Sequence, residues 1–272
     1  MIYAVLAVLG LIFGSFINAL VWRTRQQELN KKNAPSVMSG RSICPHCRHE
    51  LAAKDLVPVL SWLALRGKCR YCGQPISRQY PLVELALAAV FVISYGYWPG
   101  GVYGLGTWTL LITWLAASVG LLALLVYDLR WMMLPNKILY PTLLIAASGR
   151  LVYIASFEPH VWHALLMWLL SVLVASGIFW LIFVVSRGQW IGYGDVRLGL
   201  ITGTLLAEPG LSLLMIFLAS VIGTLFILPA LAQSRRHLTS RVAFGPFLIV
   251  ATGITVMIGQ NILDAYKDAF LR

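Results

Sequence analysis

The chain has 272 residues, of which 59% are hydrophobic and only 11% are charged, and its mean hydropathy is +0.80. A soluble domain carries charge on about a quarter of its residues, so this composition excludes an ordinary soluble protein and predicts an all-α, polytopic membrane protein. The formal net charge is +11. The basic residues are concentrated in loops between apolar segments, where membrane topology places them, so we expect a lipid bilayer as partner and no nucleic acid.

Eight apolar segments are candidates for membrane-spanning helices, since about 20 apolar residues are needed to cross about 30 Å of hydrocarbon. In chain order they cover residues 1–22, 80–98, 106–127, 134–157, 160–186, 191–213, 211–233 and 242–263. The sixth is the weakest, because only residues 198–207 are free of charge there. A helix over that stretch extends about 15 Å, so it must use its flanks to cross.

An orientation follows from the basic residues, which accumulate on the cytoplasmic side of a membrane protein. With eight spans and the N-terminus outside, all of the 21 lysines and arginines lie on the cytoplasmic side except Arg150, Lys267 and Arg272. Without the sixth span, Arg235, Arg236 and Arg241 would lie outside, which favours keeping it. The first segment has no basic residue before it and ends in Trp22-Arg23. A cleavable signal peptide differs in both respects, so we expect this segment to remain in the membrane.

Residues 23–79 form the one polar stretch, and they contain all four cysteines, as Cys44-Pro-His-Cys47 and Cys69-Arg-Tyr-Cys72. The expected cytoplasmic side is reducing, so metal binding is favoured over disulfides. Four thiolates in this spacing match a structural zinc site without an open position for catalysis, and iron in a rubredoxin-like site is the alternative. We therefore predict three parts: helix 1 over 1–22, a cytoplasmic zinc domain over 23–79 and a seven-helix catalytic membrane domain over 80–272.

Two carboxylates stand out at the edges of apolar segments. Asp128 and Asp195 are each followed two positions later by arginine, in Tyr-Asp128-Leu-Arg130 and Gly-Asp195-Val-Arg197. An ionisable side chain in the membrane costs about 2.5 to 3.5 kcal/mol on insertion scales, so a pair of them indicates a function. Asp195 follows glycines at a helix start and could instead be a capping residue. Capping does not explain Asp128, because an acid at a helix C-terminus faces the unfavourable end of the dipole.

The predicted topology brings both aspartates to the cytoplasmic face. Two carboxylates held close together share a proton. One can then activate a water while the other donates a hydrogen bond to a scissile carbonyl, which is the chemistry of an aspartyl protease. A proton relay in a transporter would use the same residue types. Glu84, at the start of the second span, fits either a catalytic acid or an N-terminal acid favoured by the helix dipole.

The chain resembles the bacterial type IV prepilin peptidases, bifunctional leader peptidases and N-methyltransferases of pilus and type II secretion systems. The resemblance covers nearly the whole chain and lies in the double CxxC upstream of two membrane-edge aspartates, the second within a GxGD motif. Further matching segments are Gly14-Ser-Phe-Ile-Asn18, Leu65-Arg-Gly-Lys68, Tyr80-Pro-Leu-Val-Glu84, Leu134-Pro-Asn136 and Phe244-Gly-Pro-Phe247.

The resemblance implies specific roles. Asp128 and Asp195 would be the catalytic dyad, and the four cysteines would hold zinc. The substrates would be prepilins or pseudopilins, whose short basic leader is removed at the cytoplasmic face of the bacterial inner membrane. The new N-terminus would then be methylated with S-adenosylmethionine, and Gly67 and Lys68 match positions linked with that step. A proton-coupled transporter and a noncatalytic, zinc-bearing pilin assembly factor remain as alternatives.

Overall fold

The computed structural model describes residues 1–29, 36, 40–232 and 243–270. Six basic residues used for the orientation lie outside the described residues: Lys31, Lys32, Arg235, Arg236, Arg241 and Arg272. The chain forms two compact units, one made of Met1–Gly96 with Ser118–Ala123 and the other of Tyr97–Ala117 with Leu124–Arg272. The predicted three-part division at residues 22 and 79 stays a prediction.

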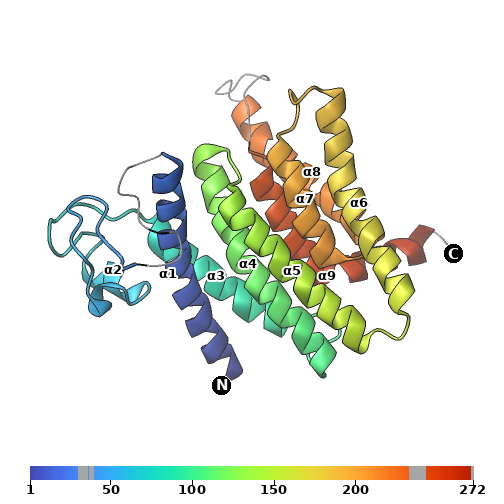
Figure 1. The fold of residues 1–272 in the computed structure, drawn as a ribbon, viewed down its shortest axis with the longest axis horizontal. Coiled ribbons are helices and arrows are strands. Elements are labelled where there is room, and N and C mark those ends of the chain that lie inside the picture. The colour runs from blue at the N-terminus through green and yellow to red at the C-terminus, as the bar shows by residue number, and fades with distance from the viewer. Residues whose placement is uncertain (30–35, 37–39, 233–242, 271–272) are drawn as a thin grey trace. The chain divides into compact units, whose positions relative to one another are not determined.

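The regular structure of the described residues is helical (Figure 1). Its elements are α1 Ile2–Glu28, the 3-10 turn η1 Ala53–Asp55, α2 Leu60–Ala64, α3 Gln79–Gly96, α4 Leu105–Trp131, α5 Asn136–Phe157, α6 Val161–Val185, α7 Tyr193–Leu206, α8 Pro209–Ala232 and α9 Gly245–Phe270. Seven of the described helices are long and apolar enough to cross a membrane. The predicted all-α, multi-pass fold with a cysteine-bearing segment between its first two long helices is confirmed.

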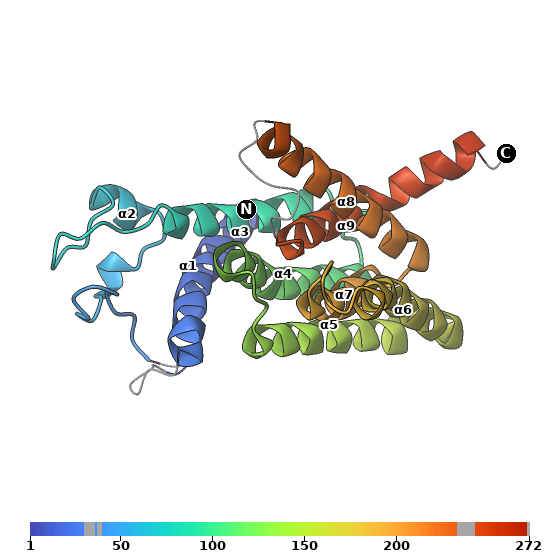
Figure 2. The same ribbon diagram turned by 90° about the horizontal axis from the view of Figure 1, so that it is seen from above.

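The predicted sixth span is shorter than its apolar pattern suggested. Within residues 191–213, α7 covers only Tyr193–Leu206, and it ends where Ala207 adopts a left-handed conformation with φ 52°. Pro209 then begins α8. The 14 residues of α7 extend about 21 Å, less than the hydrocarbon thickness. This helix packs against α5, α6, α8 and α9, so it is enclosed by protein within its unit (Figure 2).

Within each unit, some helices pack with their backbones in close contact. In the first unit, a Cβ on Gly10 would lie 2.5 Å from Ala88 Cα, and one on Gly14 would lie 2.5 Å from Glu84 Cα, so only glycine allows α1 to contact α3 this closely. In the second, Gly199 of α7 faces the backbone of α6 in the same way, and a Cβ there would lie 2.7 Å from Ala175 O. Small residues at such contacts are typical of helix packing in membranes.

Hydroxyl groups add hydrogen bonds around α7. Ser176 of α6 donates to the carbonyl of Val196 at 2.9 Å, and Ser171 donates to that of Gly203 at 2.9 Å. Because a buried polar group in the membrane needs a partner, these bonds fix the position of α7 along α6. The first turn of α7 is thereby positioned within its unit.

Candidate active site and metal centre

Asp128 lies in the last turn of α4 with 5% of its surface exposed. The helix ends three residues later, where Met132 adopts a left-handed conformation with φ 52° and donates its N–H to the Asp128 carbonyl at 2.8 Å. Nothing at this helix end favours a carboxylate, because the C-terminal carbonyls carry partial negative charge. Burial at this position costs stability, as expected of a residue kept for its chemistry.

Asp195 is the third residue of α7 and is 9% exposed. The N-cap position belongs to Gly192, and Asp195 donates its backbone N–H to the Gly192 carbonyl at 3.1 Å. No side chain caps this helix. The carboxylate nevertheless benefits from the positive end of the helix dipole, which stabilises a negative charge in the first turn. Asp195 therefore does not occupy the N-cap position, but the Gly192 amide is directed at its carboxylate, so the capping role that the sequence allowed is partly met from the third position of the helix.

The two carboxylates meet beside Gly245, the first residue of α9. A Cβ built on Gly245 would lie 2.5 Å from Asp128 Oδ2 and 3.6 Å from Asp195 Oδ1. Both acids therefore point to one small space, although they come from different helices of the same unit. Within the described residues neither aspartate forms a salt bridge. These two distances keep the two oxygens within about 6 Å of each other, a spacing at which two carboxylates interact electrostatically and can hold one water between them.

Sequence reasoning did not assign a role to Gly245. Its segment, Phe244-Gly245-Pro246-Phe247, was noticed only as part of the family resemblance. A glycine followed by proline at a helix start is a recognisable N-terminal signal, because proline is favoured in the first turn. It predicts where α9 begins, but nothing in the local sequence reveals that this helix start lies against two distant aspartates.

The arginines that follow the two aspartates contact other groups. Arg197 Nη1 donates a hydrogen bond to Asn136 Oδ1, and the Arg197 guanidinium lies over the Tyr193 ring, 5.2 Å from its centroid. Arg130 lies over the ring of Trp131 at 5.6 Å. The bond from Arg197 connects the start of α7 to the start of α5, which helps to position Asp195.

The four cysteines come together as predicted. They are free thiols, and their sulfur atoms all lie within 4.8 Å of one another. A tetrahedral metal ion with metal–sulfur bonds of about 2.3 Å places sulfurs about 3.8 Å apart. The Sγ atoms of Cys44 and Cys72 are 3.9 Å apart. The predicted clustering of the four cysteines is confirmed, and their arrangement could hold a tetrahedral metal.

Each CxxC pair lies on a tight turn of the same design. In the first, Cys44 donates its N–H to the His49 carbonyl at 3.0 Å, and Arg48 donates to the Cys44 carbonyl at 2.9 Å. Leu51 donates to the carbonyl of Ser42 at 2.8 Å and closes the hairpin. Arg48 has a positive φ of 59°, a conformation that favours glycine.

The second turn repeats this pattern 25 residues later, from Cys44 to Cys69. Cys69 donates to the Gln74 carbonyl at 2.8 Å, Gly73 donates to the Cys69 carbonyl at 2.9 Å, and Ile76 donates to the Gly67 carbonyl at 2.7 Å. Gly73 holds the positive φ here, at 71°. The module is therefore a structural repeat in which each half supplies two sulfur ligands.

Backbone amides are directed at two of the thiols, and at Cys69 they favour the ionised form. Burial raises the pKa of the Cys69 thiol, but hydrogen bonds from the amides of Cys72 and Tyr71 and from the neighbouring thiols outweigh it and lower this pKa to about 7. Since the thiolate is the form that binds metal, amides directed at sulfur prepare a ligand. Two amides of the first turn are directed at Cys44 in the same way, but burial outweighs them there and raises the pKa of the Cys44 thiol.

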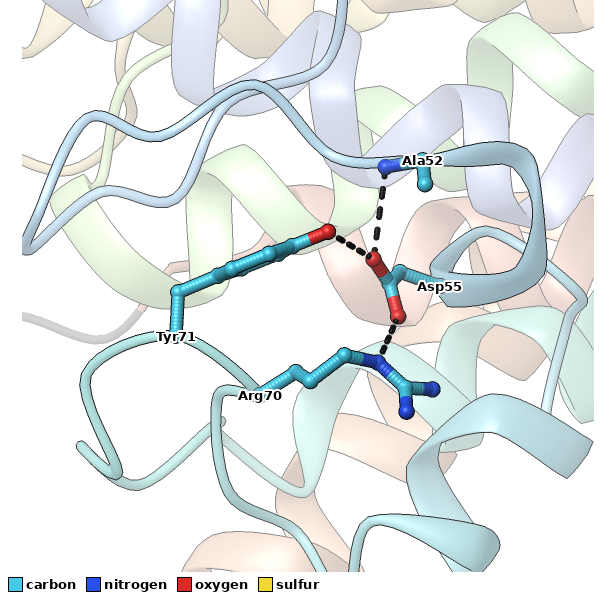
Figure 3. A network of polar contacts seen from close by, with 4 residues as sticks. All are labelled: Ala52, Asp55, Arg70 and Tyr71. Atoms are coloured by element: carbon cyan, nitrogen blue, oxygen red, sulfur yellow. Dashed lines mark hydrogen bonds and ion pairs between the residues drawn. The ribbon is translucent and has the colours of Figure 1, made fainter.

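Asp55, which is not part of the second turn, stabilises it through hydrogen bonds (Figure 3). Its carboxylate accepts hydrogen bonds from Arg70 Nε at 2.7 Å, from Tyr71 Oη at 2.9 Å and from the Ala52 amide at 3.3 Å. Burial acts to raise the pKa of Asp55, but these three donors hold it below its usual range. Tyr71 also stacks on His49 of the first turn, with ring centroids 3.7 Å apart. The two turns are thus tied to each other through residues that bind no metal.

Gly67 and Lys68 lie just before Cys69. Gly67 is buried with φ 69°, and a Cβ on it would lie 3.0 Å from Cζ2 of Trp62. Its N–H donates to the Trp62 carbonyl at 2.9 Å. Local folding alone therefore requires glycine at this position. Lys68 is exposed, and its side chain is available for a ligand.

Glu84 is buried in the second turn of α3, within the first unit. Its Oε2 accepts a hydrogen bond from the Val59 amide at 2.7 Å. This carboxylate therefore binds the backbone of the cysteine module, a role that neither sequence interpretation of Glu84 included.

Comparison with known proteins gives the family. Residues 8–98 match the bacterial peptidase A24 N-terminal domain, and residues 115–228 match the type IV leader peptidase family. A prepilin leader peptidase/N-methyltransferase from Stutzerimonas stutzeri is 32% identical over 95% of this chain and 91% of its own length. The chain belongs to the type IV leader peptidase family.

Other members of this family are similarly close. Proteins of the same name from Aeromonas hydrophila and Pseudomonas aeruginosa are each 30% identical to this chain. The alignments cover 99% and 95% of this chain, and 95% and 91% of the relatives. No solved structure matches.

Proposed function

We propose that this protein is a membrane aspartyl endopeptidase that removes the short basic leader of type IV prepilins or pseudopilins, with Asp128 and Asp195 as its catalytic pair. One observation carries the proposal: two buried carboxylates from different helices lie within 4 Å of a single point beside Gly245. The names of the relatives supply the class of substrate. We place the protein in the bacterial inner membrane with its N-terminus outside and its active site at the cytoplasmic face.

The geometry supports hydrolysis by a shared-proton pair. One aspartate is ionised and takes a proton from the bound water as the water oxygen attacks the scissile carbonyl carbon. The other is protonated and donates a hydrogen bond to the carbonyl oxygen. When the tetrahedral intermediate collapses, the carbon–nitrogen bond breaks and the leaving nitrogen receives the proton. The products are the leader with a new carboxylate and the mature protein with a free amine.

The first unit has a separate role in the proposal. We assign zinc to Cys44, Cys47, Cys69 and Cys72 as a structural ion, because all four positions around it are filled by thiols. Zinc supplies folding free energy to a module that has little apolar core. The module over residues 23–79 then presents Lys68, beside Cys69, to the methylation step.

For that step, S-adenosylmethionine would supply the methyl group to the new amine. Lys68 is the side chain we assign to binding it, and Gly67 acts by shaping the turn, because its positive φ and its contact with Trp62 require glycine. Replacing Lys68 by alanine should abolish methylation and leave leader removal intact. Replacing Gly67 by alanine should instead destabilise the module, detected as lost zinc.

The decisive test uses the purified protein in lipid nanodiscs with a prepilin substrate. Asp128→Asn or Asp195→Asn should lower cleavage by about 10³-fold or more, since the carboxylates do acid–base work that typically contributes 10²- to 10⁴-fold and also position the water. Mass spectrometry of the product reads leader removal and methyl addition together. Asp264→Asn is a matched control, because Asp264 is exposed and its carboxylate contacts Lys267 and Gln260 in the described part of the chain, away from the dyad.

Three results would contradict the proposal. The first is normal cleavage by either dyad variant with zinc content unchanged. The second is proton flux across liposomes that depends on Asp128 and Asp195 in the absence of cleavage, which would support a proton-coupled transporter. The third is binding of prepilin without cleavage by the unmodified protein, which would support a noncatalytic pilin assembly factor.

A further inference from the structure

An apolar patch is exposed on the cysteine module. It consists of Leu56, Val57, Leu60 and Leu63, on and just before the short helix α2. The exposed fractions of Leu60 and Leu63 are 65% and 58%. Four large apolar side chains gathered over eight residues of a small polar module indicate an interaction surface rather than scattered surface residues.

A hydrogen bond places this patch at membrane depth. The Val59 amide, in the middle of the patch, donates to Glu84 Oε2 at 2.7 Å. Glu84 is the sixth residue of α3, which has 18 residues and extends about 27 Å. The hydrocarbon core is about 30 Å thick, so α3 has no length to spare and its first turns must be embedded. Glu84 lies about 7.5 Å below the start of α3, and Val59 lies beside it.

The backbone of the patch is adapted to a region with little water. Val59 has φ 61° and ψ −51°, and the Leu60 amide donates to the Pro58 carbonyl at 2.6 Å, so Val59 is the centre of a γ-turn with positive φ. This turn is rare and strained, especially for a β-branched residue. The buried carboxylate of Glu84 satisfies the one amide that the turn directs toward α3. Satisfied backbone groups are what irregular structure at membrane depth requires.

The net positive charge of the same module favours contact with an anionic lipid surface. Residues 40–79 contain seven lysines and arginines and two acidic residues, Glu50 and Asp55. Both acids are paired within the module, with Arg41 and Arg70. An apolar patch on a cationic module is the combination found in segments that lie in the interface of an anionic bilayer.

We propose that Leu56, Val57, Leu60 and Leu63 insert into the bilayer leaflet at which α3 begins and anchor the cysteine module to the membrane surface. The partner is the boundary between anionic headgroups and acyl chains. A transmembrane substrate helix is the competing occupant, but the depth of Val59 beside Glu84 and the cationic charge both favour lipid. The proposal does not depend on the reaction, because it rests on the exposed patch, the hydrogen bond from Val59 to Glu84, the charge of the module and the embedding of α3.

The anchor acts directly on the second cysteine turn. Trp62 of α2 donates its indole N–H to the Ile76 carbonyl at 3.1 Å, and its ring packs against Gly67. Because Gly67 and Ile76 close the turn that bears Cys69, a fixed α2 also fixes this turn relative to the bilayer. The anchor would hold Lys68 at a constant height above the membrane.

The test measures immersion depth in the full-length protein. A genetically encoded spin-labelled amino acid replaces Leu63, or in a second protein Gln74, which is exposed on the second cysteine turn. Each protein is placed in nanodiscs of phosphatidylethanolamine and phosphatidylglycerol. The label at 63 should collide more with oxygen, which concentrates in lipid, than with a water-soluble nickel chelate. The label at 74 should show the reverse, and zinc content should be equal.

A charge variant checks that the patch itself holds the module. With the label at position 60, Leu63→Glu should move the label into water, whereas Ala53→Glu, which adds the same charge outside the patch, should not. The proposal is overturned if the label at 63 is water-accessible, or if Leu63→Glu leaves the label at 60 in lipid. It is also overturned if added prepilin shields position 63 from oxygen, because the patch would then bind the substrate.

Discussion

The cysteine module and the aspartate pair are built in opposite ways. The module gathers its four thiols from two hairpin turns, and the backbone hydrogen bonds that form each turn join residues fewer than ten apart. The aspartate pair joins the end of α4, the start of α7 and the start of α9, which are distant in the chain. A substitution in the cysteine site should therefore disrupt the module and leave the long helices intact. A site made where helices meet should be sensitive to small shifts between helices.

The largest expected effect tests the local site. Cys69→Ser removes one of four ligands, and metal binding in such sites is worth on the order of 10 kcal/mol of folding free energy. We expect the protein to lose its zinc and residues 40–78 to become sensitive to protease, while the long helices stay in the membrane. Zinc analysis and limited proteolysis in nanodiscs measure both. Protease resistance equal to that of the unmodified protein would contradict a metal-dependent module.

The second prediction tests the distant site. Gly245→Ala places a methyl group 2.5 Å from Asp128 Oδ2, so the carboxylate or α9 must move. A displacement of about 1 Å at a catalytic group can cost about 10²-fold in rate, and we expect cleavage to fall by this amount. Zinc content should stay normal. Gly253→Ala on the same helix is the control, because its nearest contact would be 3.9 Å away. Equal cleavage by the two variants would show that the space beside Gly245 has no role.

These two sites also show what sequence could predict. The clustering of the four cysteines could be predicted because CxxC spacing is typical of a local turn, and Asp128 and Asp195 could be singled out because acids in apolar segments are costly. Gly245 was missed, since no local signal reports a neighbour on another helix. The extent of α7 was overestimated because hydropathy does not register the left-handed residue at Ala207 or the enclosure of this helix by its neighbours.

The repeat within the cysteine module escaped sequence reasoning for a different reason. The two turns share their cysteines and their backbone hydrogen bonds, but few other residues. A backbone pattern of this kind constrains conformation rather than side-chain identity. Asp55 was missed likewise, because an exposed-looking loop acid gives no sign that Arg70 and Tyr71 will converge on it.

The third prediction concerns Asp55, which supports the local site without binding metal. Asp55→Asn should weaken hydrogen bonds from Arg70 and Tyr71 and destabilise the module by about 1 kcal/mol, a modest value because Arg70 is partly exposed. Zinc affinity, measured by competition with a chelator, should fall by a few-fold.

The pKa of Asp55 is lowered by folding, so its stabilisation is fully present above the ordinary aspartate pKa of about 3.9 and is lost as the pH falls through the lowered value. The difference from the unmodified protein should therefore be constant between about pH 5 and 8, and a difference that varies across this range would show that the pKa is raised instead.

The smallest predicted effect is on the stability of the module, and it compares equivalent positions in the two cysteine turns. Arg48 and Gly73 occupy equivalent places in the two turns, with φ 59° and 71°. A left-handed conformation costs a residue with a Cβ about 1 kcal/mol relative to glycine. Arg48→Gly should therefore stabilise the module by up to about 1 kcal/mol, and Gly73→Ala should destabilise it by a similar amount, since open space surrounds Gly73 and only its backbone is at issue. Chelator-induced unfolding of the two variants, followed by proteolysis at residues 40–78, measures both shifts. Shifts of the same sign would mean that the two turns are not equivalent, and that side-chain contacts of Arg48 rather than its backbone determine its contribution.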